Sequence, residues 1–262
     1  MRYLRLLVAA GVLAAGPGIA GPLEDGEAAF ERHDYATAMK LLRPLATKGD
    51  AFAQYNLGLM HANGRGVPKD GQQALAWYRR AANQGHAGAQ LNLGVLYSSD
   101  AGVPRDDQQA LQWYRKAADQ GNAYAQYNLG LMYSNGRGVH RADQHALTWF
   151  GKAAEQGNAH AQYHLGLMYA KGRAVSKDDQ QAVSWYRKAA DQGHALAQLH
   201  LGVMYDVGYG VPKDEQQAYF WWLLASVGGD ADAVKLRDQI EARITPQHRA
   251  AAQADARSWK PR

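Results

Sequence analysis

Residues 123–156 read AYAQYNLGLMYSNGRGVHRADQHALTWFGKAAEQ, and this pattern recurs along the chain in steps of 36 residues. The pair Leu129-Gly130 and the tryptophan Trp149 return at the same phase in four further copies. The equivalent pairs are Leu57-Gly58, Leu93-Gly94, Leu165-Gly166 and Leu201-Gly202. A fixed period of this length is typical of solenoids, in which each unit buries its apolar side against the next. The sequence therefore predicts a repeat array rather than a single globular core.

Each copy has the spacing of two helices. In the first helix, Ala125, Leu129 and Met132 fall on one helical face. After a loop with glycines, the second helix again places alanine and aromatic residues at intervals of three and four. Asp, Asn or His stands where each first helix begins, and Asp begins the second helix in four copies. Side-chain oxygens there cap the free N–H groups of the first turn. In the third copy Ala142 takes this place, and Asp143 is the candidate cap.

The glycine of each Leu-Gly pair lies in mid-helix, where it costs about 1 kcal/mol relative to alanine. Its recurrence predicts close helix packing, with a Tyr or Trp ring against the bare backbone. The repeat tryptophans are predicted to be core residues because they recur in phase with small residues. They are Trp77, Trp113, Trp149, Trp185 and Trp221.

The sequence outside the repeats completes the predicted domain organisation. Residues 1–20 have the features of a secretory signal peptide, with Arg2 and Arg5, a short apolar stretch and a small-residue cleavage site. An uncleaved membrane anchor is less favoured, because the apolar stretch is shorter than the ~20 residues that span a bilayer. Residues 23–49 are predicted to form a shorter, degenerate hairpin that caps the array, and residues 230–262 to form C-terminal capping helices. The full repeats between them, over residues 51–229, are 51–86, 87–122, 123–158, 159–194 and 195–229.

The composition excludes several classes of function. The net charge of the 262-residue chain is +5, but the two signs are mixed and no basic run is present, so nucleic acid is not an expected partner. The chain has no cysteine, which excludes disulfide and thiolate chemistry. After the predicted signal peptide, no segment is apolar enough to span a membrane. Nucleophile motifs, phosphate-binding loops and paired carboxylates are also missing, so we predict no catalytic residue, no cofactor and no metal.

The repeat motif resembles that of a known family. The strings Ala-x-Ala-Gln-x-x-Leu-Gly-x-Met-Tyr, Gly-x-Gly-Val-x-x-Asp and Ala-x-x-Trp-Tyr-x-x-Ala-Ala-x-x-Gly are similar to the Sel1-like repeat, a relative of the tetratricopeptide repeat. The resemblance implies an all-α fold, a right-handed α/α superhelical solenoid of helix-turn-helix repeats whose first helices line a concave face. It also implies no enzymatic activity, and a role as an adaptor, for example in envelope signalling or exopolysaccharide regulation. Departures are small, and one of them is Ala174 in place of the second loop glycine.

Candidate binding residues lie on a second side of the first helices. If Leu129 and Gly130 face the hairpin, then Tyr124 and Tyr127 point elsewhere, and aromatic rings with a polar tip suit a partly wet interface. Asparagine and histidine share another phase, and an asparagine amide offers both a donor and an acceptor to an extended peptide. The candidates are Phe52, Tyr55, Asn56, Asn92, Tyr124, Tyr127, Asn128, His160, Tyr163, His164 and His200.

Other interpretations of these residues stay open at this point. All of them are compatible with ordinary packing between repeats. His160, His164 and His200 can also bind Zn²⁺ or titrate near neutral pH as a pH-sensitive contact, although no HExxH pattern accompanies them.

The sequence as a whole favours an exported, non-enzymatic scaffold that binds a protein or peptide partner in a concave groove. The periplasm is the first expectation for its location, and secretion is the second. The alternative is a cell-wall or polysaccharide-associated binding protein whose Tyr and Trp rings stack on sugars.

Overall fold

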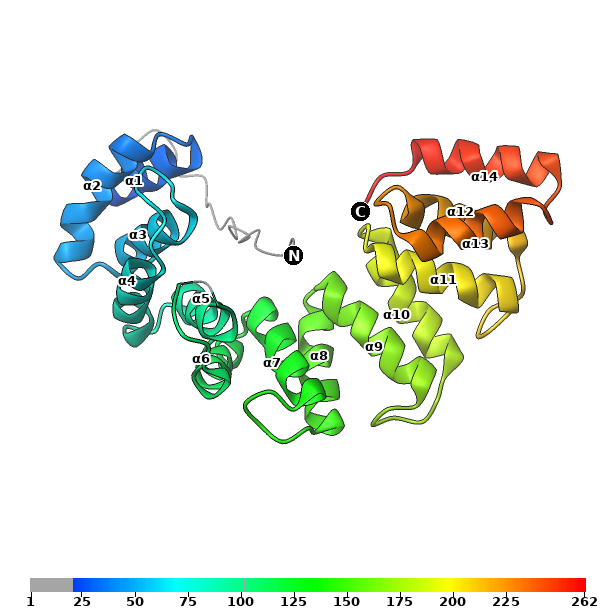
Figure 1. Cartoon of the computed structure of the whole chain (residues 1–262), viewed down its shortest axis with the longest axis horizontal. Coiled ribbons are helices and arrows are strands. Elements are labelled where there is room, and N and C mark those ends of the chain that lie inside the picture. Colours follow the sequence, from blue (N-terminus) through cyan, green and yellow to red (C-terminus); the bar gives the residue numbers. More distant parts are fainter. Residues whose placement is uncertain (1–20, 101) are drawn as a thin grey trace. The chain divides into compact units, whose positions relative to one another are not determined.

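The structure is a computed structural model that describes residues 21–100 and 102–262, so the predicted signal peptide, residues 1–20, lies outside the described residues. Within the described range the chain forms fourteen helices and no strand (Figure 1). It divides after Ala81 into two compact units, an N-terminal unit and a C-terminal unit, which are described separately. The helices are α1 (Pro22–Glu31), α2 (Tyr35–Thr47), α3 (Ala51–Asn63), α4 (Gly71–Asn83), α5 (Ala87–Ser98), α6 (Asp107–Asp119), α7 (Ala123–Asn135), α8 (Asp143–Glu155), α9 (Ala159–Lys171), α10 (Asp179–Asp191), α11 (Ala195–Val207), α12 (Glu215–Ser226), α13 (Ala231–Glu241) and α14 (Pro246–Ser258).

Consecutive helices pack as hairpins. In the C-terminal unit the hairpins are α5–α6, α7–α8, α9–α10 and α11–α12, and each second helix also contacts the first helix of the following hairpin. The last of these helices, α12, is additionally covered by α13 and α14 (Figure 1). In the N-terminal unit α2 packs against both α1 and α3. The predicted all-α array of helix-turn-helix repeats is confirmed.

The glycine in the middle of each first helix lies under an aromatic ring of the second helix of its own hairpin. A methyl group added at Gly130 would stand 2.6 Å from Cδ1 of Phe150, well inside van der Waals contact. The prediction that these glycines allow close helix packing is therefore confirmed. The other pairs are Gly58 with Tyr78, Gly94 with Tyr114, Gly166 with Tyr186 and Gly202 with Trp222.

The prediction that all five repeat tryptophans are core residues is wrong for four of them. Phe150 is 1% exposed, whereas its neighbour Trp149 is only half-buried, with the Nζ of Lys152 4.3 Å from the centre of its ring. Trp77, Trp113 and Trp185 are half-buried in the same way. Trp221 is the exception at 4% exposed, because its helix α12 is covered by two further helices.

Side-chain caps begin most of the helices. Asn122 accepts a hydrogen bond of 3.0 Å from the N–H of Ala125, and His86 and His194 cap their helices in the same way through Nδ1. The prediction that Asp143 caps α8 is wrong, since the cap position is Ala142 and makes no side-chain bond. Asp143 instead binds the guanidinium groups of Arg141 and Arg173, and such charge-assisted bonds are stronger than an exposed cap.

Buried amides join consecutive repeats in the C-terminal unit. The Nε2 of Gln126 donates to the carbonyl of Ala118 at 3.2 Å, and its Oε1 accepts from the Nε2 of Gln156 at 2.7 Å. This glutamine belongs to the Ala-x-Ala-Gln motif, whose spacing alone predicted no contact for it. Gln90 and Gln162 make the same two bonds, and Gln198 makes the first of them.

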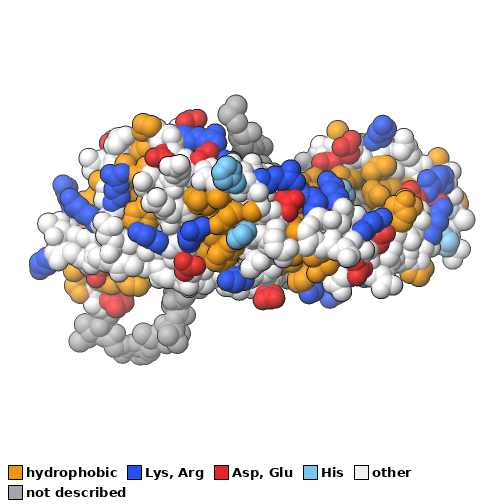
Figure 2. All heavy atoms as spheres, turned by 90° about the horizontal axis from the view of Figure 1, so that it is seen from below, with side chains coloured by type: hydrophobic (Ala, Val, Ile, Leu, Met, Phe, Trp, Pro, Cys, Tyr) orange, Lys and Arg blue, Asp and Glu red, His pale blue; other side chains and the backbone are white. Residues whose placement is uncertain are grey.

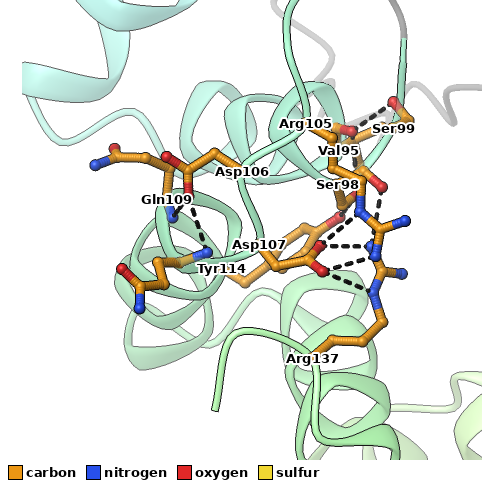
Figure 3. Close-up of polar contacts among 10 residues, drawn as sticks. Val95, Ser98, Ser99, Arg105, Asp106, Asp107, Gln109, Tyr114 and Arg137 are labelled. Atoms are coloured by element: carbon orange, nitrogen blue, oxygen red, sulfur yellow. Dashed lines mark hydrogen bonds and ion pairs between the residues drawn. The ribbon is translucent and has the colours of Figure 1, made fainter.

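Arginine side chains form a second link between repeats (Figure 3). Arg137, in the loop after α7, donates to the carboxylate of Asp107 at 2.7 Å and to the carbonyl of Ser98 at 3.0 Å. Arg105 binds the same carboxylate, and hydrogen bonds from the two guanidinium groups lower the pKa of Asp107 to about 2. Arg173 and Asp143 repeat this contact one repeat later.

Replacing Ala174 by glycine is expected to stabilise the chain by about 0.5–1 kcal/mol. Ala174 has φ +60°, a left-handed conformation that costs an alanine about 1–2 kcal/mol, while glycine adopts it freely but loses more entropy on folding. Gly138 and Gly210 occupy the equivalent position in other repeats with φ of +65° and +66°. The urea midpoint of Ala174→Gly, followed by circular dichroism, tests this, and a lower midpoint would contradict it.

Candidate functional site

An aromatic surface runs across the first turns of α7, α9 and α11 in the C-terminal unit. Tyr124 is 39% exposed and Leu196 is 43% exposed, and His160 stands exposed at the same phase between them. Tyr127 and Tyr163 lie one turn further along and are half-buried. We call these five residues the aromatic face.

Rings on this face stack on one another. The centre of the Tyr127 ring is 5.5 Å from that of His160, and Tyr163 stacks on His194 at 4.9 Å. These contacts hold the half-buried tyrosines in place, so their rings support the face as well as contributing to it.

His164 and His200 have a different environment. The His164 ring lies parallel to Phe150 at 4.8 Å, and the His200 ring lies parallel to Tyr186 at 5.4 Å. Each histidine therefore covers the ring that packs on the glycine of the preceding hairpin. Burial lowers the pKa of His164 to about 4 and also lowers that of His200.

The structure adds His194 to the group of histidines. Its Nε2 is 3.0 Å from the Nδ1 of His160, whereas the sequence pattern predicted His194 only as a helix cap. The sequence contained a signal for this contact. A cap residue stands one position before its helix, so it lies near the first turn of the first helix of the preceding repeat. No group of three or more His, Asp or Glu side chains among residues 21–100 and 102–262 is arranged to hold a metal ion.

The candidate asparagines lie within the packing of the hairpins. Asn92 is 3% exposed, and the structure shows no hydrogen-bond partner for its Nδ2. Asn128 is half-buried and lines a small, partly open cavity of about 70 Å³ together with Ser98, Tyr114 and Arg137. The structure therefore brings Tyr124, Tyr127, His160 and Tyr163 together, whereas Asn92 is buried in α5 and Asn128 is half-buried in α7.

The remaining candidates belong to the N-terminal unit. Phe52 is 56% exposed, and Tyr55 is half-buried with its ring 6.0 Å from that of Tyr78. Asn56 is 8% exposed, and its Nδ2 donates to the carbonyl of Phe52 at 3.1 Å and to Glu27 at 3.3 Å.

Charges of both signs are spread over the surface. Figure 2 shows Lys and Arg side chains interspersed with Asp and Glu, with smaller groups of hydrophobic side chains between them. In the part of the chain that the structure describes, no helix is long and apolar enough to cross a membrane.

Consecutive helical hairpins with an exposed aromatic face define a helical-repeat solenoid, a class of protein that offers a surface for binding. Five consecutive segments match the family model of the Sel1 repeat, and the chain belongs to this family. The matched segments are residues 51–86, 87–122, 123–158, 159–194 and 195–230. Sel1 repeats mediate protein–protein interaction, and proteins built from them are generally non-enzymatic scaffolds.

Solved structures agree with this assignment. A Sel1 repeat protein from Oxalobacter formigenes is 32% identical with a TM-score of 0.80, and the match covers 91% of this chain and 97% of that one. A protective antigen present in uropathogenic Escherichia coli strains is 30% identical with a TM-score of 0.60, over 92% of this chain and 61% of the antigen. The comparison with curated proteins finds no match.

Proposed function

We propose that this chain is an exported, non-enzymatic scaffold that holds a protein or peptide partner on the aromatic face of α7, α9 and α11. The observation that carries the proposal is the exposure of Tyr124, His160 and Leu196 at one phase of the successive first helices α7, α9 and α11. A row of exposed aromatic and apolar side chains is more typical of an interaction site than scattered single ones. Tyrosine is also enriched at protein interfaces, since its ring gives contact area and its hydroxyl tolerates water.

The proposed location is the periplasm, or the outside of the cell. It rests on the sequence of residues 1–20, with Arg2 and Arg5 ahead of a short apolar stretch. A role in envelope signalling or exopolysaccharide regulation would fit that location. Export is tested by the N-terminal mass of the protein recovered from the periplasm, which is expected to begin at Gly21.

Binding to polysaccharide is the second candidate, and the packing of the tryptophans makes it weaker. Lys116, Lys152 and Lys188 place their ammonium groups 4.0–4.3 Å from the ring centres of the preceding tryptophans. A sugar that stacked on these rings would first have to displace a cation. Tyr124 of the aromatic face is 39% exposed, and an aromatic ring with a polar tip suits a protein partner.

The double variant Tyr124→Ser with Leu196→Ser is expected to lower the yield of crosslinked partner by about tenfold or more. The reason is that an anchor side chain at an interface can contribute over about 1 kcal/mol of binding free energy. A photo-crosslinking residue placed at Gly88, the position in α5 equivalent to Tyr124 and next to α7, would report the partner in living cells by mass spectrometry. Tyr124 and Leu196 are better positions for this substitution than Tyr127 and Tyr163, because the half-buried rings of Tyr127 and Tyr163 also support the fold.

The matched control is Val227→Ser, which removes an 86% exposed apolar side chain elsewhere in the C-terminal unit. Crosslinked partners that persist in the double variant and in the control alike would refute binding at the aromatic face. Crosslinks to glycan with no protein would favour the polysaccharide alternative.

A further inference from the structure

A chain of hydrogen bonds connects the start of α11 to the aromatic face. The N–H of Ala197 donates to the Nδ1 of His194 at 3.2 Å, and the Nε2 of His194 lies 3.0 Å from the Nδ1 of His160. The first bond fixes the protonation of His194, because a nitrogen that accepts an N–H bond cannot carry a proton of its own. His194 is therefore the Nε2–H tautomer, and it donates that proton to His160.

This arrangement has no position for an additional proton. A proton on the Nδ1 of His194 would face the N–H of Ala197 and remove the cap of α11. A proton on the Nδ1 of His160 would face the N–H of His194. Charging either ring therefore breaks a hydrogen bond and leaves two donors opposite each other.

The surroundings of the pair do not offset an added positive charge. Lys171 and Arg173 are the charged side chains that act on the neighbouring His200 and His164, and both are cations. Near the cap, the N–H of Arg262 donates to the carbonyl of Asp191, a main-chain contact. The rings that pack directly on the pair are Tyr127 of α7 on His160 and Tyr163 of α9 on His194. The next layer is formed by His164 of α9 on Phe150 of α8 and by His200 of α11 on Tyr186 of α10. Trp259 and Pro261 lie beside Gly193, the residue before His194.

We propose that the His160–His194 pair is an acid-sensitive switch that holds the first turn of α11 against α9 at neutral pH and releases it when the pair is protonated. His160 and Leu196 belong to the aromatic face, so acid would also disrupt a partner bound there; this last step rests on the proposed function. The switch itself is a property of the free chain.

The pH window follows from the direction of the shift. Burial, together with the neighbouring His160 and His164, lowers the pKa of His194 from 6.5 to about 4. Between these values the unfolded or released chain binds a proton that the closed chain does not. The stability of the closed state therefore falls as the pH falls from 6.5 to about 4, and levels off below. The carboxylates of Asp107 and Asp143 have pKa values lowered from 3.8, so their contribution is lost only at more acid pH.

The tautomers and titration are measured by nitrogen-detected NMR of the imidazoles in the full chain. We expect the Nε2–H tautomer of His194 at pH 7 and a titration midpoint near 4. The variant His160→Phe introduces the residue that the first repeat has at the equivalent position, Phe52. In this variant the titration midpoint of His194 should rise, because one neighbouring imidazole is removed. A His194 midpoint at 6.5, or an Nδ1–H tautomer at pH 7, would overturn the proposal.

Release of the helix is measured by hydrogen exchange at the N–H of Ala197. Its protection factor should fall by tenfold or more, and by up to about a hundredfold, between pH 7 and pH 4.5, because each pH unit below 6.5 favours the protonated open state by about tenfold. His194→Asn should keep its protection, since asparagine caps the equivalent helices at Asn122 and Asn158 without titrating. Equal losses in the two proteins would overturn the switch.

A second control separates this pair from histidine caps in general. His86→Asn changes the other histidine cap, at α5, where the residue in phase with His160 is Phe52. This variant should retain the acid-dependent exchange at Ala197. None of these measurements requires a partner, so they decide the switch even if the aromatic face proves not to bind one.

Discussion

Phe150→Ala is expected to destabilise the chain by about 3–5 kcal/mol, the usual cost of removing a buried phenylalanine ring. The ring is 1% exposed and lies between Gly130 in its own hairpin and His164 in the next. Its loss would leave a cavity bounded by helix backbone, which can close only if α7 and α8 move together. The urea midpoint, followed by circular dichroism of the full chain, gives the difference.

The neighbouring residue provides the comparison. Trp149→Ala removes a larger side chain but is expected to cost only about 1–2 kcal/mol, because the ring is half-buried and one face meets the ammonium of Lys152 rather than core atoms. Two adjacent aromatic residues should thus differ by about 1–4 kcal/mol in the order opposite to their size. Equal losses, or a larger loss at Trp149, would show that the hairpin packs through the tryptophan instead.

Gly130→Ala is expected to destabilise the chain by about 1–3 kcal/mol, even though alanine is the better helix former. The added methyl group would lie 2.6 Å from Cδ1 and 2.7 Å from Cε1 of Phe150, and the ring cannot retreat without separating the two helices. The steric cost therefore exceeds the gain in helix propensity of about 1 kcal/mol.

Gly151 is a matched control within the same hairpin. It also lies in mid-helix, but a methyl group added there meets no atom within 4 Å. Gly151→Ala should therefore stabilise the chain by about 0.5–1 kcal/mol. Stabilisation by both alanine substitutions would mean that propensity alone governs these positions. As a further check, Phe150→Leu should reduce the penalty of Gly130→Ala, since the two sites are in contact and their effects are not additive.

One position shows how the repeats vary around this contact. Asn92, Asn128, His164 and His200 share one phase, and the two histidines lie flat on the aromatic ring that covers the preceding glycine. Asn128 borders the same kind of ring, Tyr114, beside a small cavity. The change from a small amide to an imidazole is thus a change in how the gap between hairpins is filled. It also brings His164 close enough to act on His194 in the acid-sensitive region.

The period of 36 residues by itself determined the number of full repeats, the order of their helices and the role of the mid-helix glycines. These features depend on contacts within one hairpin or between identical surfaces of adjacent hairpins, so the sequence of every repeat contains the same residues for them. The caps at Asn122 and Asn158 were equally clear, because a cap acts on its own helix over three residues.

The packing of the folded chain distinguishes between neighbouring residues that the repeat pattern treats alike. Trp149 and Phe150 both fit a helical stripe, and the packing of α7 on α8 selects the second. Asp143 has the chemistry of a cap, but a guanidinium from the next repeat takes its carboxylate. His160 and His194 lie 34 positions apart, one repeat less two residues, and meet only because successive first helices stand side by side. Periodicity carries the information that all repeats share, whereas each of these contacts depends on side chains that differ between repeats and on the distance at which the helices pack.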